Sequence, residues 1–556
     1  MNQRSKWAIL SGVILAMLLS SLDQTIVSTA MPTIVQELQG LEHISWVFTA
    51  YMLGSTVTVP IYGKLSDLFG RRKLYLIGIA IFLGGSVLCG LSQTMGQLIF
   101  FRGLQGIGGG AMMVNSFAVI GDVFPPAERS KYQGLIGAVF GLSSVAGPLL
   151  GGWITDHASW RWVFYVNIPL GIIAIIVLAS ALPAIKTHIH NKKIDWWGGL
   201  FILLTLVPLL LSLVWGGSVY EWSSWPIIGG LILGFVSLFI FVRIEKKAIN
   251  PILSLDLFRN RVFLVSVIAL FLIAMGMFGA ILYVPLFSQG VTGGTATHAG
   301  LILTPMMLSL VVASVLSGQI IARTGKYKVL AIIGTTITVG ALVFFSTVNT
   351  GTNNTGLIMR MIVLGLGLGS TMPIFTLAVQ SAVGRERLGE VTAGTQLFRS
   401  VGGTVGTAVL GGIMNSQLET RMEKLRGEPF VGQMHQLMPD KAAVNVNGSF
   451  IQTVLNPGAQ QHIRESLDKI PSQYHDSVTG NFNHFIGSAK TAFSNSVDAV
   501  FIVAAILMGL ALIAVFFLPE IPLRRSEKPA MQEAGVLLED ELAQSDEESQ
   551  PRADEK

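Results

Sequence analysis

The sequence is poor in charge and almost devoid of cysteine. Charged residues make up 12% of its 556 positions, whereas a typical soluble domain has roughly 25%. A water-soluble enzyme of this length is therefore excluded, because too few polar groups remain to cover its surface. Cys89 is the one cysteine, which excludes an internal disulfide and a cysteine-rich metal site.

Signatures of catalysis and of cofactors are also lacking. The sequence has no G-x-x-x-x-G-K-[ST] loop for nucleotide phosphates. Its histidines are scattered among polar segments, where they form no metal-binding pattern. We therefore expect no enzymatic activity, no catalytic residue, no metal and no cofactor.

Long hydrophobic runs are what the sequence has in abundance. Hydrophobic residues make up 51% of the chain, glycine adds 61 positions, and the mean hydropathy is +0.62. A membrane helix needs about 20 mostly apolar residues. Fourteen stretches meet that requirement, at roughly 8–30, 43–62, 74–92, 96–120, 132–154, 163–183, 197–217, 224–243, 262–286, 298–321, 329–348, 356–382, 390–415 and 495–518. The sequence therefore predicts an all-α polytopic membrane protein.

Lysine and arginine indicate how these helices are oriented. With the N-terminus inside, nearly all basic residues that border the runs fall on the inner side, and the short outer loops contain Arg161 alone. Cytoplasmic loops carry such an excess of basic residues. The net charge of +5 thus reflects topology and not a nucleic-acid partner. We expect a multi-pass protein of a bacterial plasma membrane, with both termini in the cytoplasm.

An internal repeat indicates two related halves. GKLSDLFGRRK from Gly63 to Lys73 recurs as GQIIARTGKYK from Gly318 to Lys328, at an offset of 255 residues. Transporters use such repeats to build a central site that opens to either side. The predicted organisation is an N-terminal six-helix half at 1–183, an inserted helix pair at 184–250, a C-terminal six-helix half at 251–518, and an acidic cytoplasmic tail at 519–556.

A long polar segment at 416–494 separates the last two hydrophobic runs and is predicted to be an outer loop. Within it, Ile463, Leu467 and Ile470 follow a helical spacing, which predicts short amphipathic helices. The acidic tail has the composition of a solvated, disordered end.

Several segments resemble motifs of the major facilitator superfamily. GKLSDLFGRRK is similar to motif A, RGLQGIGGG from Arg102 to Gly110 to motif B, and GPLLGG from Gly147 to Gly152 to motif C. LDQTIVSTAMP at 22–32 and WRWVFYVNIP at 160–169 resemble the fourteen-span drug:proton antiporters, the EmrB/QacA-type group. The resemblance implies the major facilitator fold with two inserted helices, and a monomeric exporter that is driven by the proton gradient.

Asp23 is the one acid that lies deep in a hydrophobic run. A carboxylate there is costly unless it is paired, protonated or facing water, so we expect it to carry the coupling proton or to attract a cationic substrate. A structural hydrogen bond between helices is the alternative. Arg102 is the natural counter-ion, and the resemblance links it to proton exchange; helix packing is its alternative role. Arg399 is buried by its position and needs a partner that the sequence does not identify.

The motif A resemblance implies a latch that closes the inner side. Its residues are Gly63, Asp67, Gly70, Arg71 and Arg72. Asp67 is expected near the start of the thirteenth run, around 389–392, where the positive helix end favours an anion. Asp122 is expected to pair with a motif A arginine. A basic loop that only sets topology is the alternative.

The motif C resemblance implies export by exchange with protons. Pro148 should bend its helix, and the glycines Gly147, Gly151 and Gly152 should let the fifth and tenth runs approach as a pivot. Generic packing of small residues is the alternative interpretation.

A substrate cavity should be lined from both halves by aromatic, methionine and amide side chains, which suit varied apolar ligands. The candidates are Tyr51, Asn115, Phe271, Met275, Phe278, Met307, Phe375, Gln380 and Gln396.

The predicted function is proton-coupled export of amphipathic, often cationic, drugs or toxic compounds by alternating access, with antibiotic resistance as a result. The partners are then small substrates, protons and the lipid bilayer. One alternative is an exporter or flippase of one endogenous lipid, siderophore or metabolite. Another is a membrane sensor that transports nothing.

Overall fold

The computed structural model describes residues 3–38, 43–183, 192–217, 219–292, 296–437, 454–455, 460–461, 463–465 and 472–521. Within these ranges, 14 helices are long and apolar enough to cross a membrane, as the sequence predicts. The first seven elements are α1 (Gln3–Leu38), α2 (Ile44–Phe69), α3 (Arg71–Leu91), α4 (Met95–Val123), α5 (Pro126–His157), the short α6 (Trp162–Tyr165) and α7 (Asn167–Ala181). The described residues contain no β-strand beyond one isolated bridge between Gly216 and Tyr220.

The rest of the chain is helical in the same way. The elements are α8 (Trp196–Trp215), α9 (Trp225–Glu245), the 3₁₀ turn η2 (Leu255–Arg259), α10 (Arg261–Gly290), α11 (Ala296–Thr324), α12 (Lys328–Phe345), α13 (Asn354–Ser381), η3 (Arg385–Arg387), α14 (Leu388–Arg426), α15 (Pro429–Leu437) and α18 (Ser472–Phe516). Uninterrupted helices follow from the apolar composition, because a bilayer leaves no water to satisfy backbone groups outside a helix.

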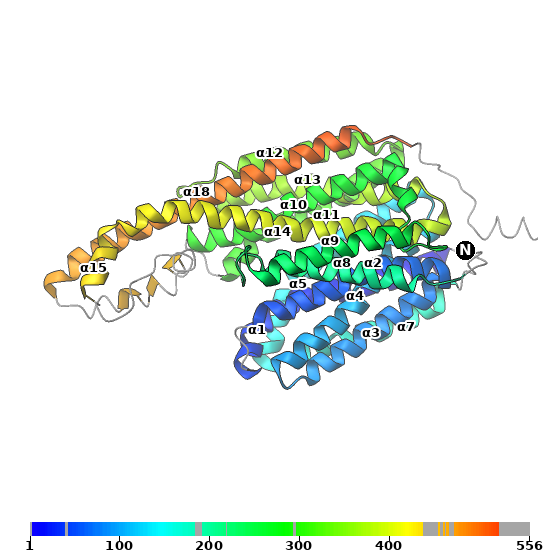
Figure 1. The fold of residues 1–556 in the computed structure, drawn as a ribbon, viewed down its shortest axis with the longest axis horizontal. Helices are drawn as coiled ribbons and strands as arrows, with labels where there is room; N and C mark the ends of the chain where they lie inside the picture. The colour runs from blue at the N-terminus through cyan, green and yellow to red at the C-terminus, as the bar shows by residue number, and fades with distance from the viewer. Residues whose placement is uncertain are drawn as a thin grey trace, which may run out of the picture.

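The helices pack into two groups (Figure 1). In the first, α1 packs on α5 and α7, and α4 packs on α2 and α3. In the second, α10 packs on α14 and α18, and α13 packs on α11 and α12. Between them in sequence, α8 and α9 pack on each other, and α8 also contacts α2 and α14. This arrangement agrees with two halves and an inserted pair, although the exact predicted boundaries stay predictions.

The two copies of the repeat share a backbone feature. Gly70 separates α2 from α3 with a φ of 92°, and Gly325 lies between α11 and α12 with a φ of 74°. Only glycine adopts such angles at little cost. The repeated glycine therefore marks the same tight turn between two spans in each group.

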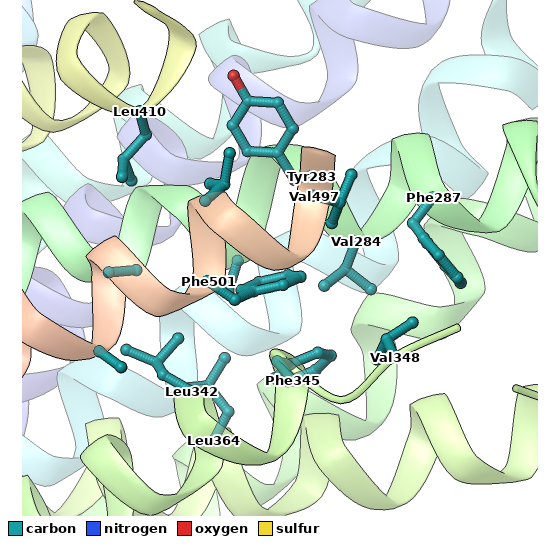
Figure 2. Packing of buried hydrophobic residues seen from close by; sticks show 14 of the residues in the cluster. Tyr283, Val284, Phe287, Leu342, Phe345, Val348, Leu364, Leu410, Val497 and Phe501 are labelled. Carbon is teal, nitrogen blue, oxygen red and sulfur yellow. The ribbon is translucent and has the colours of Figure 1, made fainter. Parts of the chain in front are cut away.

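The core of the second group is continuous and aromatic (Figure 2). Phe345 of α12 stacks on Phe501 of α18 with ring centroids 4.9 Å apart. Tyr283, Val284 and Phe287 of α10 belong to the same buried cluster. The last span is thus a full member of the second group.

The predicted outer loop differs from the structure at both of its ends. Helix α14 continues to Arg426 and α18 begins at Ser472, so both spans extend well beyond a bilayer, and the two helices project together in Figure 1. Leu418, Met422 and Leu425 form a buried stripe with helical spacing. This stripe explains why the helix continues through a polar segment.

The extension has a small core of its own. Phe430 of α15 lies against Phe482 and Phe485 of α18, with ring centroids 5.1 and 5.4 Å apart. Ile463 packs against this core, whereas Leu467 and Ile470 lie outside the described residues.

The end of α18 is fastened to the start of α12. The Tyr327 hydroxyl donates to the Pro519 carbonyl at 2.7 Å and accepts the Ile521 amide at 2.9 Å. Burial raises the pKa of Tyr327, so its hydroxyl stays protonated and remains a donor. The acidic tail that follows lies outside the described residues.

Candidate functional site

A buried ion pair lies inside the first helix group. Arg102 of α4 donates from Nη1 to Asp23 Oδ2 of α1 at 2.5 Å, and both side chains are fully buried. The sequence prediction that Arg102 is the counter-ion of Asp23 is therefore confirmed as a contact. A buried pair in a low-dielectric setting is strongly coupled, because removing one charge leaves the other uncompensated.

Two amides that the sequence analysis missed hold the second oxygen of Asp23. Gln105 donates to Asp23 Oδ1 at 2.8 Å, and Asn167 donates to the same atom at 3.0 Å. Ser86 accepts from both amides, at 3.2 and 2.9 Å. The carboxylate is thus held in one orientation by three side chains on α4 and α7.

The guanidinium of Arg102 is only partly satisfied. Its Nη1 also donates to Gln105 Oε1 at 2.8 Å, but Nε and Nη2 are buried without a hydrogen-bond partner. The Tyr51 ring lies 4.3 Å from its central carbon, in cation–π geometry. Tyr51, a candidate for the cavity, therefore belongs to the ion-pair site, and its hydroxyl lies 3.1 Å from Ser20 Oγ.

The segment at 160–169 forms hydrogen bonds with α1 at two positions along that helix. Asn167 reaches Asp23 near the middle of the helix, and Trp160 donates to Glu37 near its end at 2.7 Å. Arg161 pairs with the same carboxylate. The polar residues in an otherwise apolar stretch were the available sequence signal for these contacts.

A second cluster closes one side of the molecule, the side where α1 begins, which we call the inner side. Asp67 at the end of α2 accepts the backbone N–H groups of Gly389 and Glu390, at 3.0 and 2.9 Å. These are the first turns of α14, where the helix dipole favours an anion. The predicted contact of Asp67 around 389–392 is confirmed.

Close backbone approach makes this contact possible. A Cβ on Gly63 would lie 2.4 Å from the Ala393 Cβ and 2.7 Å from the Gly389 carbonyl oxygen. A side chain at Gly63 would therefore separate α2 from α14. The predicted role of this glycine in close helix contact agrees with the structure.

Arginine side chains stabilise this contact between the end of α2 and the start of α14, which we call the latch. Arg71 donates from Nε to Asp122 Oδ2 at 3.0 Å, and it also pairs with Asp67 and donates to Ser66. The expected pairing of Asp122 with a motif A arginine is confirmed for Arg71. Arg72 instead donates to the Ala179 carbonyl of α7, which joins the turn to its own helix group.

Glu390 is the main inner-side residue that the sequence analysis did not identify. Its side chain is 1% exposed and accepts the Ser254 backbone N–H at 2.6 Å. Arg387 Nε lies 3.3 Å and Lys64 Nζ 3.8 Å from its Oε2. Because the Glu390 amide also donates to Asp67, one residue joins the latch to the segment that follows the inserted pair. An acid in the first turn of a helix was the signal for it.

The motif C glycines were predicted to let the fifth and tenth runs, α5 and α11, approach each other. The two helices do pack together, but other glycines of α5 make the contact. Gly134, Gly137 and Gly141 are the α5 glycines that contact α11, as the 2.6 Å between a Gly134 Cβ and the Ser314 carbonyl oxygen shows. Gly147 and Gly151 instead face α1, because their added Cβ atoms would lie 2.0 Å from Thr25 Oγ1 and 2.2 Å from Thr29 Oγ1. Because an α-helix turns by about 100° per residue, Gly147 and Gly151 lie on nearly the same face of α5, and this face contacts α1.

The rest of motif C is less constrained. Gly152 has open space around it. Pro148 lies within α5, which continues through it from Pro126 to His157. The motif therefore fixes the distance between α5 and the helix that carries Asp23.

The nine cavity candidates do not gather in one place. Phe271, Met275 and Phe278 of α10 pack on the α14 glycines Gly402, Gly406 and Gly403. Met307 packs near Gly141, and Phe375 is fully buried in the core of the second group. Asn115 is buried and donates to the Ala111 carbonyl. Phe375 therefore lines no open space in this conformation.

Gln380 joins the two helix groups. It donates to the Phe117 carbonyl of α4 at 3.2 Å and to Thr392 at 3.0 Å, and it accepts from Gln133 of α5 at 3.0 Å. Together with the latch and the α5–α11 contact, it places the closest approaches between the groups toward the inner ends of their helices. The structure is therefore closed on the inner side.

The sequence is similar to those of known membrane transporters. A model of the Major Facilitator Superfamily matches residues 13–407. The chain belongs to the Major Facilitator Superfamily. It is 39% identical to the multidrug transporter protein MdtP of Bacillus subtilis, over 96% of both chains. It is 35% identical to multidrug resistance protein 3 of the same organism, over 93% of this chain and 96% of the relative.

Solved structures agree on the fold. The proton:xylose symporter XylE aligns with a TM-score of 0.55 at 14% identity, over 94% of this chain and 97% of that one. The human organic anion transporter MFSD10 aligns with a TM-score of 0.55 at 14% identity, over 91% of this chain and all of that one. The predicted major facilitator fold with fourteen spans, related to multidrug exporters, is confirmed. The chain is a multi-pass transporter of the cell membrane.

Proposed function

We propose that this transporter exports amphipathic, often cationic, compounds across the plasma membrane in exchange for protons, by alternating access. The carrying observation is the fully buried Asp23–Arg102 pair, in which the carboxylate is held by two amides and an arginine. A carboxylate in the hydrophobic interior is a natural proton carrier. Export of drugs is supported by the likeness to multidrug transporters.

Proton binding would uncouple the pair. When Asp23 is protonated, the ion pair with Arg102 loses its charge attraction, and α1 and α4 become free to separate. When the proton leaves, the pair forms again, as in the inner-closed state. Exchange follows if protons reach Asp23 from the outer side and substrate displaces them from the inner side. In this proposal both termini are cytoplasmic, the protein acts as a monomer, and the proton gradient replaces any cofactor.

The test uses proteoliposomes with an imposed pH gradient and two substrates, one cationic and one neutral. We expect Asp23→Asn to insert normally and to lose gradient-driven export of both, whereas Asp23→Glu keeps part of it. Asp256→Asn, an exposed acid on η2, is the matched control and should behave as the wild type. Full export of both substrates by Asp23→Asn would refute the proton-carrier role. Loss of the cationic substrate alone would mean that Asp23 only attracts cations.

A further inference from the structure

Three arginines lie inside the spans, and two of them donate to oxygen acceptors of the chain. Arg102 has Asp23, as described above. Arg360, its counterpart in the repeat, donates to the Phe344 and Gly356 carbonyls and to Thr347 at 2.9 to 3.1 Å, and it stacks on the Phe344 ring. Both charges are therefore engaged by oxygen acceptors of the chain, although Nε and Nη2 of Arg102 have no hydrogen-bond partner among the described residues.

Arg399 differs from both. Its one hydrogen-bond contact among the described residues is a 3.8 Å approach of Nη1 to the Met372 sulfur on α13. A thioether is a weak acceptor, and no carboxylate of the described residues lies within salt-bridge distance of Arg399. The charge is therefore uncompensated by the chain in this conformation.

The position of Arg399 along α14 places this charge near the middle of the membrane. It lies eleven residues after the first residue of α14, Leu388, or about 16 Å along the helix axis. The hydrocarbon core is about 30 Å thick. An arginine near the membrane middle is costly and marks a pathway for substrate or ions.

Neighbouring residues show which way Arg399 faces. Leu397 and Val401 pack with residues of α8, on the side that the inserted pair covers. Arg399 is about 200° around the helix from each of them. Thr392, two turns earlier on the Arg399 side, bonds Gln380 at the junction of the two helix groups. Arg399 therefore faces the interior between the groups and not the lipid.

A second polar group without a partner lies nearby. Gln396, one turn before Arg399, is 3% exposed, and its Oε1 atom is buried with no hydrogen bond. Buried polar groups are normally satisfied. On one face of α14, the Arg399 guanidinium can thus donate to a ligand, and Gln396 Oε1 can accept from a donor group of the same ligand.

We propose that Arg399 binds a carboxylate or similar planar anionic group of the transported compound, and that Gln396 Oε1 accepts from a hydroxyl or N–H donor of the same compound. A guanidinium matches a carboxylate in bidentate geometry. The accepted substrates then include amphipathic acids and zwitterions, beyond the cationic class. This inference rests on the proposed export function, but it concerns a binding site on α14 in the second helix group, whereas Asp23 lies on α1 in the first.

The test compares 1-naphthaleneacetic acid with 1-naphthaleneacetamide, which differ in charge and little in shape. Equilibrium binding to the detergent-solubilised full chain is measured by calorimetry at a pH where the acid is ionised. We expect Arg399→Gln to weaken binding of the acid by about tenfold or more, the usual worth of a charge-assisted contact, and to leave binding of the amide within about twofold. Arg399→Lys should restore part of the acid affinity.

Arg259→Gln removes an exposed charge on η2 and should change neither affinity. Equal weakening of acid and amide in Arg399→Gln would overturn the proposal, because it would mean that Arg399 supports the structure or pairs with an acid of the chain in another state. Unchanged acid binding would overturn it as well. Binding needs no gradient, so it is scored separately from gradient-driven export of the cationic and neutral substrates used above. Absence of both exports in the wild type would instead refute the proposed export function.

Discussion

At the scale of residues, the site depends on how one carboxylate is held. Asp23 has three donors, and two of them are neutral amides. Arg102 responds to the charge, whereas Gln105 and Asn167 fix the direction of the carboxyl group. Orientation and charge balance are thus supplied by different side chains.

Asn167→Ala tests this division. The variant removes the α7 donor to Asp23, and a hydrogen bond to a charged group is worth about 1.5–3 kcal/mol. We expect gradient-driven export to fall by about tenfold, with normal insertion into the membrane. Asn349→Ala, in an exposed turn before α13, is the control. Unimpaired export by Asn167→Ala would show that the Asn167 amide does not position Asp23.

The charged residues around Asp23 could be predicted from the sequence, whereas the neutral amides that bind it could not. Asp23 and Arg102 were predictable because a charge in an apolar run must find a partner. Asp67 and Asp122 followed from the motif A resemblance. Gln105 is three residues from Arg102 and shares its helix face, but its contact with α1 depends on how the helices are rotated. Asn167 depends on the same rotation. One chain without a structure does not contain that information.

At the scale of helices, glycines set the distances between spans. Gly147 and Gly151 let α5 lie directly against α1, at Thr25 and Thr29. Gly63 does the same for α2 and α14. Each contact involves a helix that also carries a charged residue of the site or latch.

Gly147→Leu should separate α5 from α1 next to Asp23. We expect normal insertion but no export, because a Cβ at this position already lies 2.0 Å from Thr25 Oγ1. Gly152→Leu, where the space is open, is the matched control and should export as the wild type does. Comparable export by the two variants would exclude this role for the α1–α5 contact.

Gly63→Val should weaken the inner latch, since its side chain would clash with Ala393 and the Gly389 carbonyl. We expect a cysteine introduced at Ser66, which is 1% exposed, to react faster with a membrane-impermeant thiol reagent from the inner side. The same cysteine in a Gly84→Val background, where nothing lies nearby, is the reference. Equal labelling rates in both backgrounds would contradict the latch.

At the scale of the whole molecule, the sequence predicted the number of spans, the repeat and the family. It did not predict the helical extension of α14 and α18, although the spacing of Leu418, Met422 and Leu425 was a usable signal. The polar composition of 416–494 concealed that signal, because a helix outside the membrane needs only a narrow apolar stripe.

The acidic tail is expected to be dispensable for transport. Truncation after Ile521 keeps both hydrogen bonds of Tyr327, so export should stay within about twofold of the wild type. Truncation after Leu518 removes both bonds, each worth about 1 kcal/mol, and should lower the melting temperature by a few degrees. Thermal unfolding and export assays check both variants. Complete loss of export after the first truncation, with normal insertion, would show that the tail is required.

A twelve-helix derivative of this protein cannot be obtained simply by cutting out α8 and α9 and closing the gap. The segment after α9 is held by Glu245, which accepts the Ile252 amide at 3.1 Å, and by Glu390, which accepts the Ser254 amide at 2.6 Å. Excision of the pair would remove the first anchor and pull on the second, and Glu390 donates its own amide to Asp67 of the latch. The inserted helices α8 and α9 are therefore connected to the latch. A twelve-helix derivative would need a redesigned connection that preserves Ser254 and its neighbours.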